Sequence, residues 1–141
     1  MSLTFKYKKI ERPPPAGMAY VPYIPLTFTG PNTSIEVMAL LDSGADVSAI
    51  PKDVAEILGI PLDGKREEIG GIGGKVGAIE SSVNVLVQGS HERYQFNMKV
   101  KVILDEHDSK FPIILGRLGF FDKFDITFVE RHRKVVLRKR D

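Results

Sequence analysis

The 141-residue sequence contains no cysteine and no tryptophan. Without cysteine the chain has neither a disulfide scaffold nor a thiol nucleophile. No hydrophobic run approaches the ~20 residues of a membrane-spanning helix, and residues 2–10 are too polar for the core of a signal peptide. These absences exclude a disulfide-stapled fold and a membrane-spanning helix, and we expect a cytoplasmic protein with no membrane partner.

What the chain does contain is enough for one folded domain. Hydrophobic residues make up 43% of it, and a domain of this length buries roughly 68–70% of the surface of its unfolded chain. The net charge of +2 hides an uneven distribution, since both ends are basic and the middle is acidic. Basic ends are compatible with nucleic-acid binding, but no aromatic residues interleave with these charges. We therefore expect solvated basic ends and no nucleic-acid partner.

Residues 1–19 are expected to form an N-terminal extension, because Pro13–Pro15 favours a stiff polyproline spacer. The domain is expected over residues 20–141, ending in a basic C-terminal hairpin. Residues 21–29 and 34–41 flank the turn signal Gly30-Pro31-Asn32, which predicts a hairpin.

A second hairpin is predicted from residues 81–88 and 93–102, which flank residues 89–92. In the second of these strands hydrophobic and polar residues alternate fully, which indicates one face on a core and one face in water. Short helices are predicted at residues 51–58 and 118–124.

The chain is predicted to finish with strands at residues 125–129 and 134–137. The sequence thus predicts a mainly β domain with two short helices.

The first candidate site is Asp42-Ser43-Gly44-Ala45-Asp46, which follows a hydrophobic strand. A carboxylate at the end of a buried strand is expected to be desolvated, and such groups are kept mostly for function. Gly44 permits a sharp turn and a close approach of the backbone. A plain Asx-turn, in which the Asp42 side chain accepts a hydrogen bond from the following backbone, explains the same residues equally well.

The second candidate is the glycine-rich segment from Ile69 to Lys75, between two predicted strands. A phosphate-binding loop is excluded by its spacing, because Ile69 and Val76 stand where that motif requires a glycine and a hydroxyl residue. A flexible loop and a lid over a site remain as alternatives. The third candidate is Arg117, which ends the hydrophobic run Ile113–Gly116; Asp46 is a plausible acceptor for a bidentate ion pair.

Together these three motifs resemble the active-site loop, flap tip and second psi-loop of the retropepsins, the single-lobed aspartic proteases. Their order and approximate spacing match over about residues 20–128. The resemblance implies a closed β-barrel of the single-lobed acid-protease type and a homodimer that hydrolyses peptide bonds without a cofactor. It also implies that each subunit contributes one catalytic aspartate, Asp42. Two carboxyls about 3 Å apart cannot both ionise, so the pair shares a proton and can activate water.

The resemblance also implies roles for the neighbouring residues. Ser43 would form a hydrogen bond across the dimer, Gly44 would lie against the substrate backbone, and Asp46 with Arg117 would brace the dimer around the site. The flap would comprise Ile69, Gly70, Gly71, Ile72, Gly73 and Gly74. Substrate pockets would be formed by Leu40, Ala45, Ile69, Ile72 and Ile114.

The C-terminal end departs from the retroviral pattern and is closer to the hairpin of cellular and prokaryotic relatives. Two other functions therefore stay open. One is a dimeric module that binds extended peptides with little or no proteolysis. The other is a processing protease restricted to its own precursor or to one partner. No metal site is expected, because the histidines lack ligand spacing and His107 with its acidic neighbours fits a solvated loop.

Overall fold

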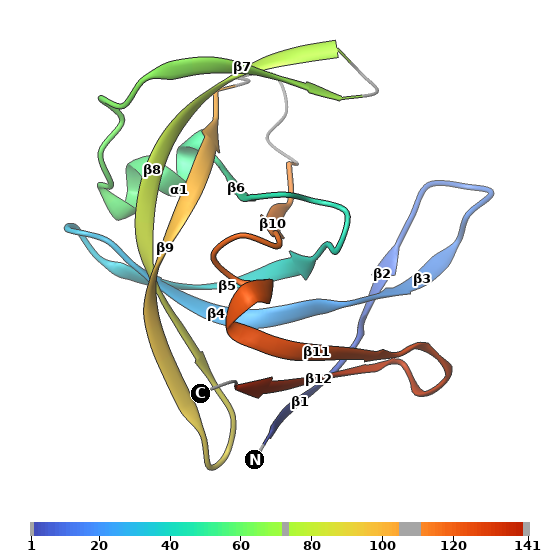
Figure 1. Cartoon of the computed structure of the whole chain (residues 1–141). Helices are drawn as coiled ribbons and strands as arrows, with labels where there is room; N and C mark the ends of the chain where they lie inside the picture. The colour runs from blue at the N-terminus through green and yellow to red at the C-terminus, as the bar shows by residue number, and fades with distance from the viewer. Residues whose placement is uncertain (1, 72–73, 105–110, 140–141) are drawn as a thin grey trace.

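The computed structural model describes residues 2–71, 74–104 and 111–139 (Figure 1). Within these residues the chain is mainly β, with one α-helix and two short 3-10 turns. The strands are β1 (Ser2–Lys6), β2 (Lys8–Glu11), β3 (Met18–Val21), β4 (Tyr23–Thr29), β5 (Ser34–Leu41), β6 (Ser48–Pro51), β7 (Arg66–Gly71), β8 (Gly74–Gln88), β9 (Arg93–Ile103), β10 (Ile113–Leu115), β11 (Phe124–Val129) and β12 (Lys134–Lys139). The helix is α1 (Lys52–Leu58), and the 3-10 turns are η1 (Phe121–Lys123) and η2 (Glu130–His132).

A seven-stranded sheet forms the body of the molecule, in the order β4-β5-β10-β6-β9-β8-β7. Strand β4 also pairs with β8, through Thr27–Thr29 opposite Asn84–Leu86. The strand pairings therefore return to β4, although only three residue pairs make this last connection. The expected closed barrel stays a prediction.

The predicted hairpins are confirmed. Strands β4 and β5 pair from Tyr23↔Leu40 to Thr29↔Ser34, around the Gly30-Pro31-Asn32 turn. Strands β8 and β9 pair over eleven residues from Ala78↔Ile103 to Gln88↔Arg93. The inward face predicted for β9 is also confirmed, because its Met98, Val100 and Val102 are buried.

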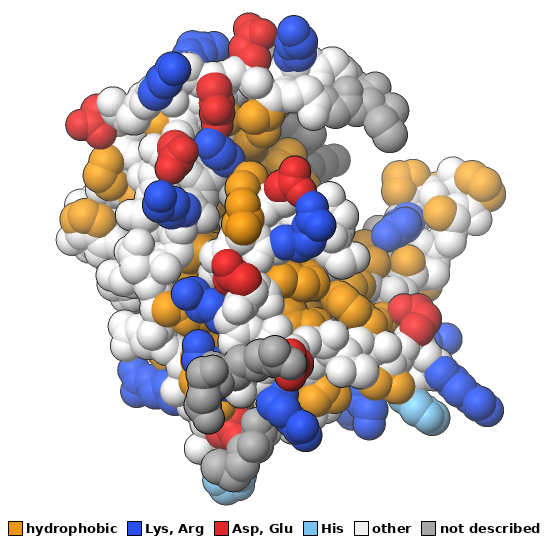
Figure 2. All heavy atoms as spheres, viewed as in Figure 1, with side chains coloured by type: hydrophobic (Ala, Val, Ile, Leu, Met, Phe, Trp, Pro, Cys, Tyr) orange, Lys and Arg blue, Asp and Glu red, His pale blue; other side chains and the backbone are white. Residues whose placement is uncertain are grey.

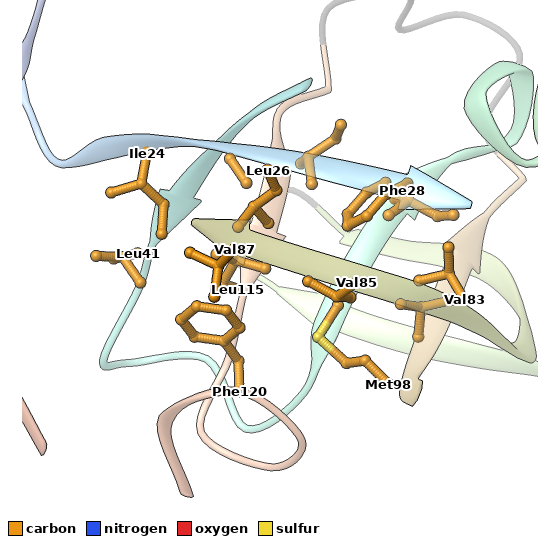
Figure 3. Close-up of a cluster of buried hydrophobic side chains, with 14 of the residues drawn as sticks. Ile24, Leu26, Phe28, Leu41, Val83, Val85, Val87, Met98, Leu115 and Phe120 are labelled. Carbon is orange, nitrogen blue, oxygen red and sulfur yellow. The ribbon is translucent and has the colours of Figure 1, made fainter. Parts of the chain in front are cut away.

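The core fills the space between these hairpins (Figure 3). Hydrophobic residues alternate along β4 and β8, so one face of each strand contributes its whole set. Burial of each such side chain contributes about 1.5–3 kcal/mol. The central side chains are Ile24, Leu26, Phe28, Val83, Val85, Val87, Met98, Leu115 and Phe120.

The helix prediction is half correct. Helix α1 forms as expected and ends at Gly59, which adopts the left-handed conformation with φ of 74°. The helix predicted at residues 118–124 is not an α-helix, since only the 3-10 turn η1 forms there. Two features prevent a helix: Leu118 forms a β-bridge with Val47, and Gly119 has φ of 92°, outside the helical region.

The two ends of the chain meet in a separate three-stranded sheet, β1-β12-β11. No strand was predicted in residues 1–19, but β1 pairs with β12 and Leu3 is buried in the core. Residues 13–16, expected to be a spacer, form the turn between β2 and β3, where the Ala16 amide donates to the Pro13 carbonyl (3.1 Å). The boundary at residue 20 stays a prediction.

The C-terminal hairpin consists of β11 and β12, joined through η2. This matches the strands predicted at residues 125–129 and 134–137. Among the residues that the structure describes, no helix has both the length and the hydrophobicity to cross a membrane.

Candidate functional site

The loop that carries Asp42 begins where β5 ends. Its first turn is held by Asp42 itself, whose side-chain Oδ1 accepts a hydrogen bond from the Gly44 amide (2.9 Å). The Asp42 carbonyl accepts a second hydrogen bond from the Ala45 amide (3.1 Å). The Asx-turn considered from the sequence is therefore present, and it fixes the orientation of the carboxyl group.

A second loop, after β10, is bound to the first. Strand β10 lies parallel to β5, with Leu115 beside Leu41, and the Asp42 amide donates to the Leu115 carbonyl (3.0 Å). Beyond it the Arg117 amide donates to the Ala45 carbonyl (2.9 Å) and the Leu118 amide donates to the Asp46 carbonyl (2.8 Å). These bonds join the two loops into one unit, which we call the floor (residues 42–48 and 115–118).

Gly116 is the point of closest approach within the floor. A Cβ atom at this position would lie 2.4 Å from the carbonyl carbon and oxygen of Val47. The Gly116 amide donates to the hydroxyl of Ser48 (3.0 Å), which is fully buried. Only glycine therefore allows the two loops to pack this closely.

Ser48 is a residue that the sequence analysis missed. Its hydroxyl also donates to the Met98 sulfur at 3.5 Å, so this one side chain links β6, β9 and the loop after β10. The only signal in the sequence is a polar residue at the start of a hydrophobic strand. A serine in that position is common, so the pattern alone does not single it out.

The ion pair expected between Asp46 and Arg117 forms, with Arg117 Nη2 donating to Asp46 Oδ1. The structure gives one contact rather than the bidentate pair that the sequence suggested. Both side chains are exposed, at 75% for Asp46 and 60% for Arg117. An exposed pair contributes at most about 1 kcal/mol to the stability of a single chain.

The Asp42 side chain is less buried than expected. It is half-buried, and the following residues Ser43 and Gly44 are exposed. The strand before it is buried only on one side, with Ala39 and Leu41 in the core. The outer side of the loop is open in the single chain, which leaves room for another molecule beside Asp42.

Leu40 and Ile114, two of the residues expected to line substrate pockets, lie on the opposite face of β5 and β10 from the core. Ile114 lies beside Leu40 across the β5–β10 pair, and both are half-buried. Ile114 and Ile69 pack against one small hydrophobic cluster of Ala49, Ala78 and Ile103. This cluster places the β7–β8 hairpin close to the strands that enter the floor. Ala45, also half-buried, lies within the Asp42 loop.

The β7–β8 hairpin contains the expected glycine-rich segment. Gly70 lies opposite Lys75 and Gly71 opposite Gly74, so the strands remain paired to the last described residues. Ile72 and Gly73, expected at the tip, lie outside the described residues.

An ion cluster holds the base of this hairpin. Glu67 of β7 accepts a hydrogen bond from Lys101 of β9. Lys101 also donates to Glu80 of β8 (3.2 Å), and its side chain is only 17% exposed. The hydrogen bond to Glu67, followed by that to Glu80, raises the pKa of Lys101 although partial burial opposes the shift. The cluster therefore ties β7, β8 and β9 together.

A groove of about 330 Å³ adjoins the floor, and the sequence gave no sign of it. It is lined by Val47, Glu80, Asn97, Lys99, Val100, Lys101, Leu118 and Gly119. Across residues 2–71, 74–104 and 111–139, no group of three or more histidine and carboxylate side chains is arranged to hold a metal ion. His107 and its acidic neighbours lie outside those ranges.

Comparison with known proteins identifies relatives of this arrangement. The family described as "Aspartyl protease" matches residues 24–117. A retropepsin-like aspartic protease from Rickettsia conorii superposes with a TM-score of 0.58 at 20% identity, over 97% of this chain and 90% of that one. At this identity the likeness shows the fold, which is retropepsin-like.

Two further structures are less similar. The retroviral protease-like domain of Ddi1 from Leishmania major has a TM-score of 0.48 at 20% identity, over 86% of this chain and 94% of that one. EIAV protease in complex with an inhibitor has a TM-score of 0.44 at 24% identity, over 69% and 82%. The comparison with curated proteins gave no match.

Proposed function

This chain belongs to the aspartyl protease family, and from that premise we propose that it is an endopeptidase whose catalytic group is a pair of Asp42 carboxyls. One carboxyl comes from each subunit of a homodimer. The observation that carries the proposal is the floor, in which Asp42 is oriented by the Gly44 amide while its outer side stays open. The floor of one chain supplies one such aspartate, so the pair requires a second copy.

The chemistry follows from the sharing of one proton. The ionised carboxyl takes a proton from a water molecule, and this water attacks the carbonyl carbon of the peptide bond. The protonated carboxyl donates a hydrogen bond to the carbonyl oxygen, on which negative charge develops. The carbon–nitrogen bond of the resulting tetrahedral intermediate then breaks, and the leaving nitrogen receives a proton from the carboxyl pair. No covalent bond to the enzyme forms in these steps.

The neighbouring residues support this chemistry. The exposed Ser43 hydroxyl is free to reach the partner subunit, and Gly44 leaves space for the substrate backbone. Asp46 and Arg117 brace the same loop. Leu40, Ala45, Ile69 and Ile114 form hydrophobic pockets, so the preferred cleavage site lies between hydrophobic residues.

In this proposal the β7–β8 hairpin is a flap over the substrate. An extended peptide would pair with its backbone on one side and with the floor on the other. Ile72 and Gly73 belong to this flap by their position in the sequence. The additional pairing of β4 with β8 supports the closed barrel expected of such a protease.

The Asx-turn favours a second candidate. Because Asp42 Oδ1 accepts a hydrogen bond from the Gly44 amide, Asp42 stabilises the turn even without catalysis. The same fold would then be a dimeric module that binds extended peptides. In that case the wild type would bind peptides without cutting them, and Asp42→Asn would bind them equally well.

Cleavage of a mixed peptide library, read by mass spectrometry at pH 4 and pH 7, tests the proposal. We expect the wild type to cut between hydrophobic residues and Asp42→Asn to make none of these cuts. Equal cutting by both proteins would contradict the assignment of Asp42. No cutting by a confirmed wild-type dimer would favour the binding module or a protease dedicated to one partner.

A further inference from the structure

The β2–β3 hairpin stands apart from the rest of the fold. Its two strands pair only with each other among the described residues, and in Figure 1 they project from the body on the same side as the end of the β7–β8 hairpin. We call this hairpin the arm (residues 8–21). A two-stranded hairpin is at best marginally stable by itself in water, so an arm of this kind gains from being covered.

The base of the arm lies next to Asp42. The Leu41 amide donates to the carbonyl of Pro22, the residue that follows β3 (3.1 Å). The arm therefore rises from the edge of the floor, and the space-filling view shows an open notch between the arm and the β7–β8 hairpin (Figure 2). The loop from β5 to β6, which contains Asp42, runs between these two hairpins in Figure 1. A molecule that approaches Asp42 from the open side thus meets the arm.

The arm presents hydrophobic side chains to solvent. Met18 is 52% exposed and Tyr20 is 37% exposed, and their positions opposite Glu11 and Lys9 place them on one face. Arg133 covers part of this face, because its guanidinium lies 3.8 Å from the centre of the Tyr20 ring. Met18 stays uncovered. An exposed hydrophobic face beside unpaired strand edges is typical of a surface that binds a partner.

The charge of the arm fits a second copy of this chain. The arm contains Lys8, Lys9 and Arg12 against the single acid Glu11. Residues 22–129 of the same chain are acidic, with 15 acidic and 10 basic residues, whereas residues 130–141 are basic, with six basic and two acidic residues. The arm of one copy is therefore attracted to the acidic segment 22–129 of another copy.

The area that a stable dimer interface must bury also favours a second copy as the partner of the arm. The proposed pair of Asp42 carboxyls brings only a few residues of each floor together, whereas a stable interface buries about 800 Å² on each partner. Additional surface is needed beside Asp42, and the arm presents Met18 and Tyr20 there, in addition to the exposed Leu118 of the floor.

We infer that the arm grips a second copy of this chain and holds the two Asp42 residues together. This inference rests on the proposed function, since the partner is the second subunit of the protease. The arm acts in assembly and takes no part in the chemical step.

The test compares two substitutions of equally exposed residues. Met18→Asp places a negative charge on the arm, where Met18 is 52% exposed. Ile57→Asp places the same charge on α1, where Ile57 is 54% exposed; α1 lies on the opposite side of the view from the arm (Figure 1). Sedimentation velocity over a range of protein concentrations gives the dimer dissociation constant. We expect Met18→Asp to raise this constant more than tenfold and Ile57→Asp to leave it at the wild-type value. Met18→Ser, which only removes the hydrophobic contact, is expected to lie between them.

Peptide cleavage separates assembly from chemistry. Met18→Asp is expected to lose cleavage at low protein concentration and to regain it at high concentration, by mass action. Thermal unfolding of both variants confirms that the chains are folded. Equal dimer dissociation constants for Met18→Asp and Ile57→Asp would overturn the inference. A raised KM of Met18→Asp for the peptide, with an unchanged dimer dissociation constant, would also overturn it, because the arm would then bind substrate and not the second subunit.

The failure of the proposed function would look different. Asp42→Asn is expected to dimerise like the wild type but not to cut. A wild type that dimerises through the arm without cutting any peptide would refute the protease and leave the arm intact. A wild type that cuts as a monomer would refute both the pair of carboxyls and the arm.

Discussion

The floor and the β7–β8 hairpin are both rich in glycine, yet glycine has different purposes in the two regions. In the floor, a Cβ at Gly116 would lie 2.4 Å from the Val47 backbone, so the glycine is required by packing. In the hairpin, a Cβ at Gly70 would meet nothing within 4 Å. The floor is held by buried hydrogen bonds and close contact, and the hairpin is held at its base by an ion cluster near the surface. The position of Asp42 thus depends on dense packing, whereas the space around Gly70 would admit a side chain.

Gly116→Ala is expected to have the largest effect. The added methyl group forces the two loops apart, and overpacking of this kind costs about 3 kcal/mol of the free energy of unfolding. Urea unfolding of the variant and of Gly70→Ala provides the comparison, because the second substitution adds the same group in open space. Equal midpoints for the two variants would refute the close packing of the floor.

The sequence alone does not show which of these glycines is required by close packing. Gly116 and Gly70 both follow hydrophobic residues in turn-like segments, and the contact that distinguishes them joins Gly116 to Val47, far away in the chain. Local patterns did predict the β4–β5 and β8–β9 hairpins, since alternation and turn residues act over short distances. The motif around Asp42, the glycine-rich segment Ile69–Gly74 and the run that ends at Arg117 together predicted the family.

Other parts of the site depended on contacts between distant segments. The arm was missed because the three prolines suggested a spacer, whereas pairing of Lys8–Glu11 with Met18–Val21 closes them into a turn. The second helix was predicted from the local sequence and is prevented by the bridge between Val47 and Leu118 and by the positive φ of Gly119. Lys101 and Glu67 are 34 residues apart, so their ion pair is invisible without the fold.

Ser48→Ala is expected to have an intermediate effect and again to weaken the floor. It leaves the Gly116 amide without its acceptor, and a buried donor without a partner costs about 2 kcal/mol. Ser34→Ala is the matched control, because the Ser34 hydroxyl forms a hydrogen bond with Thr29 (2.7 Å) at the exposed surface. Chemical denaturation should show a lower free energy of unfolding for Ser48→Ala and almost no change for Ser34→Ala. The reverse order would mean that Ser48 does not hold the second loop.

Lys101→Met is expected to have the smallest effect, on the hairpin rather than on the floor. It removes the cation between Glu67 and Glu80, at a cost of about 1 kcal/mol. Lys99→Met serves as the control, since Lys99 is 84% exposed and lies 4.0 Å from Glu80. A loss of stability as large for Lys99→Met as for Lys101→Met would show that the position of the cation is unimportant.

The contribution of Lys101 depends on pH in a defined direction. The pKa of Lys101 is raised in the folded chain, so its stabilisation is fully present below the pKa of the unfolded chain, about 10.4. It is lost as the pH rises through the higher pKa of the folded chain. The difference in unfolding free energy between wild type and Lys101→Met should therefore be constant from pH 7 to pH 9 and shrink in stronger alkali. A difference that grows with pH would contradict this.

Mixing wild type with Asp42→Asn shows whether two subunits each supply one Asp42 to the same site. A fixed amount of wild type cuts a peptide while the variant is added in increasing excess, at concentrations above the dimer dissociation constant. Mixed dimers lack one of the two Asp42 carboxyls, so we expect the cleavage rate to fall about tenfold at about a ninefold excess of the variant. The double variant Asp42→Asn/Met18→Asp should inhibit far less, because its arm is impaired. A cleavage rate that stays constant at every excess of Asp42→Asn would contradict a site shared between two subunits.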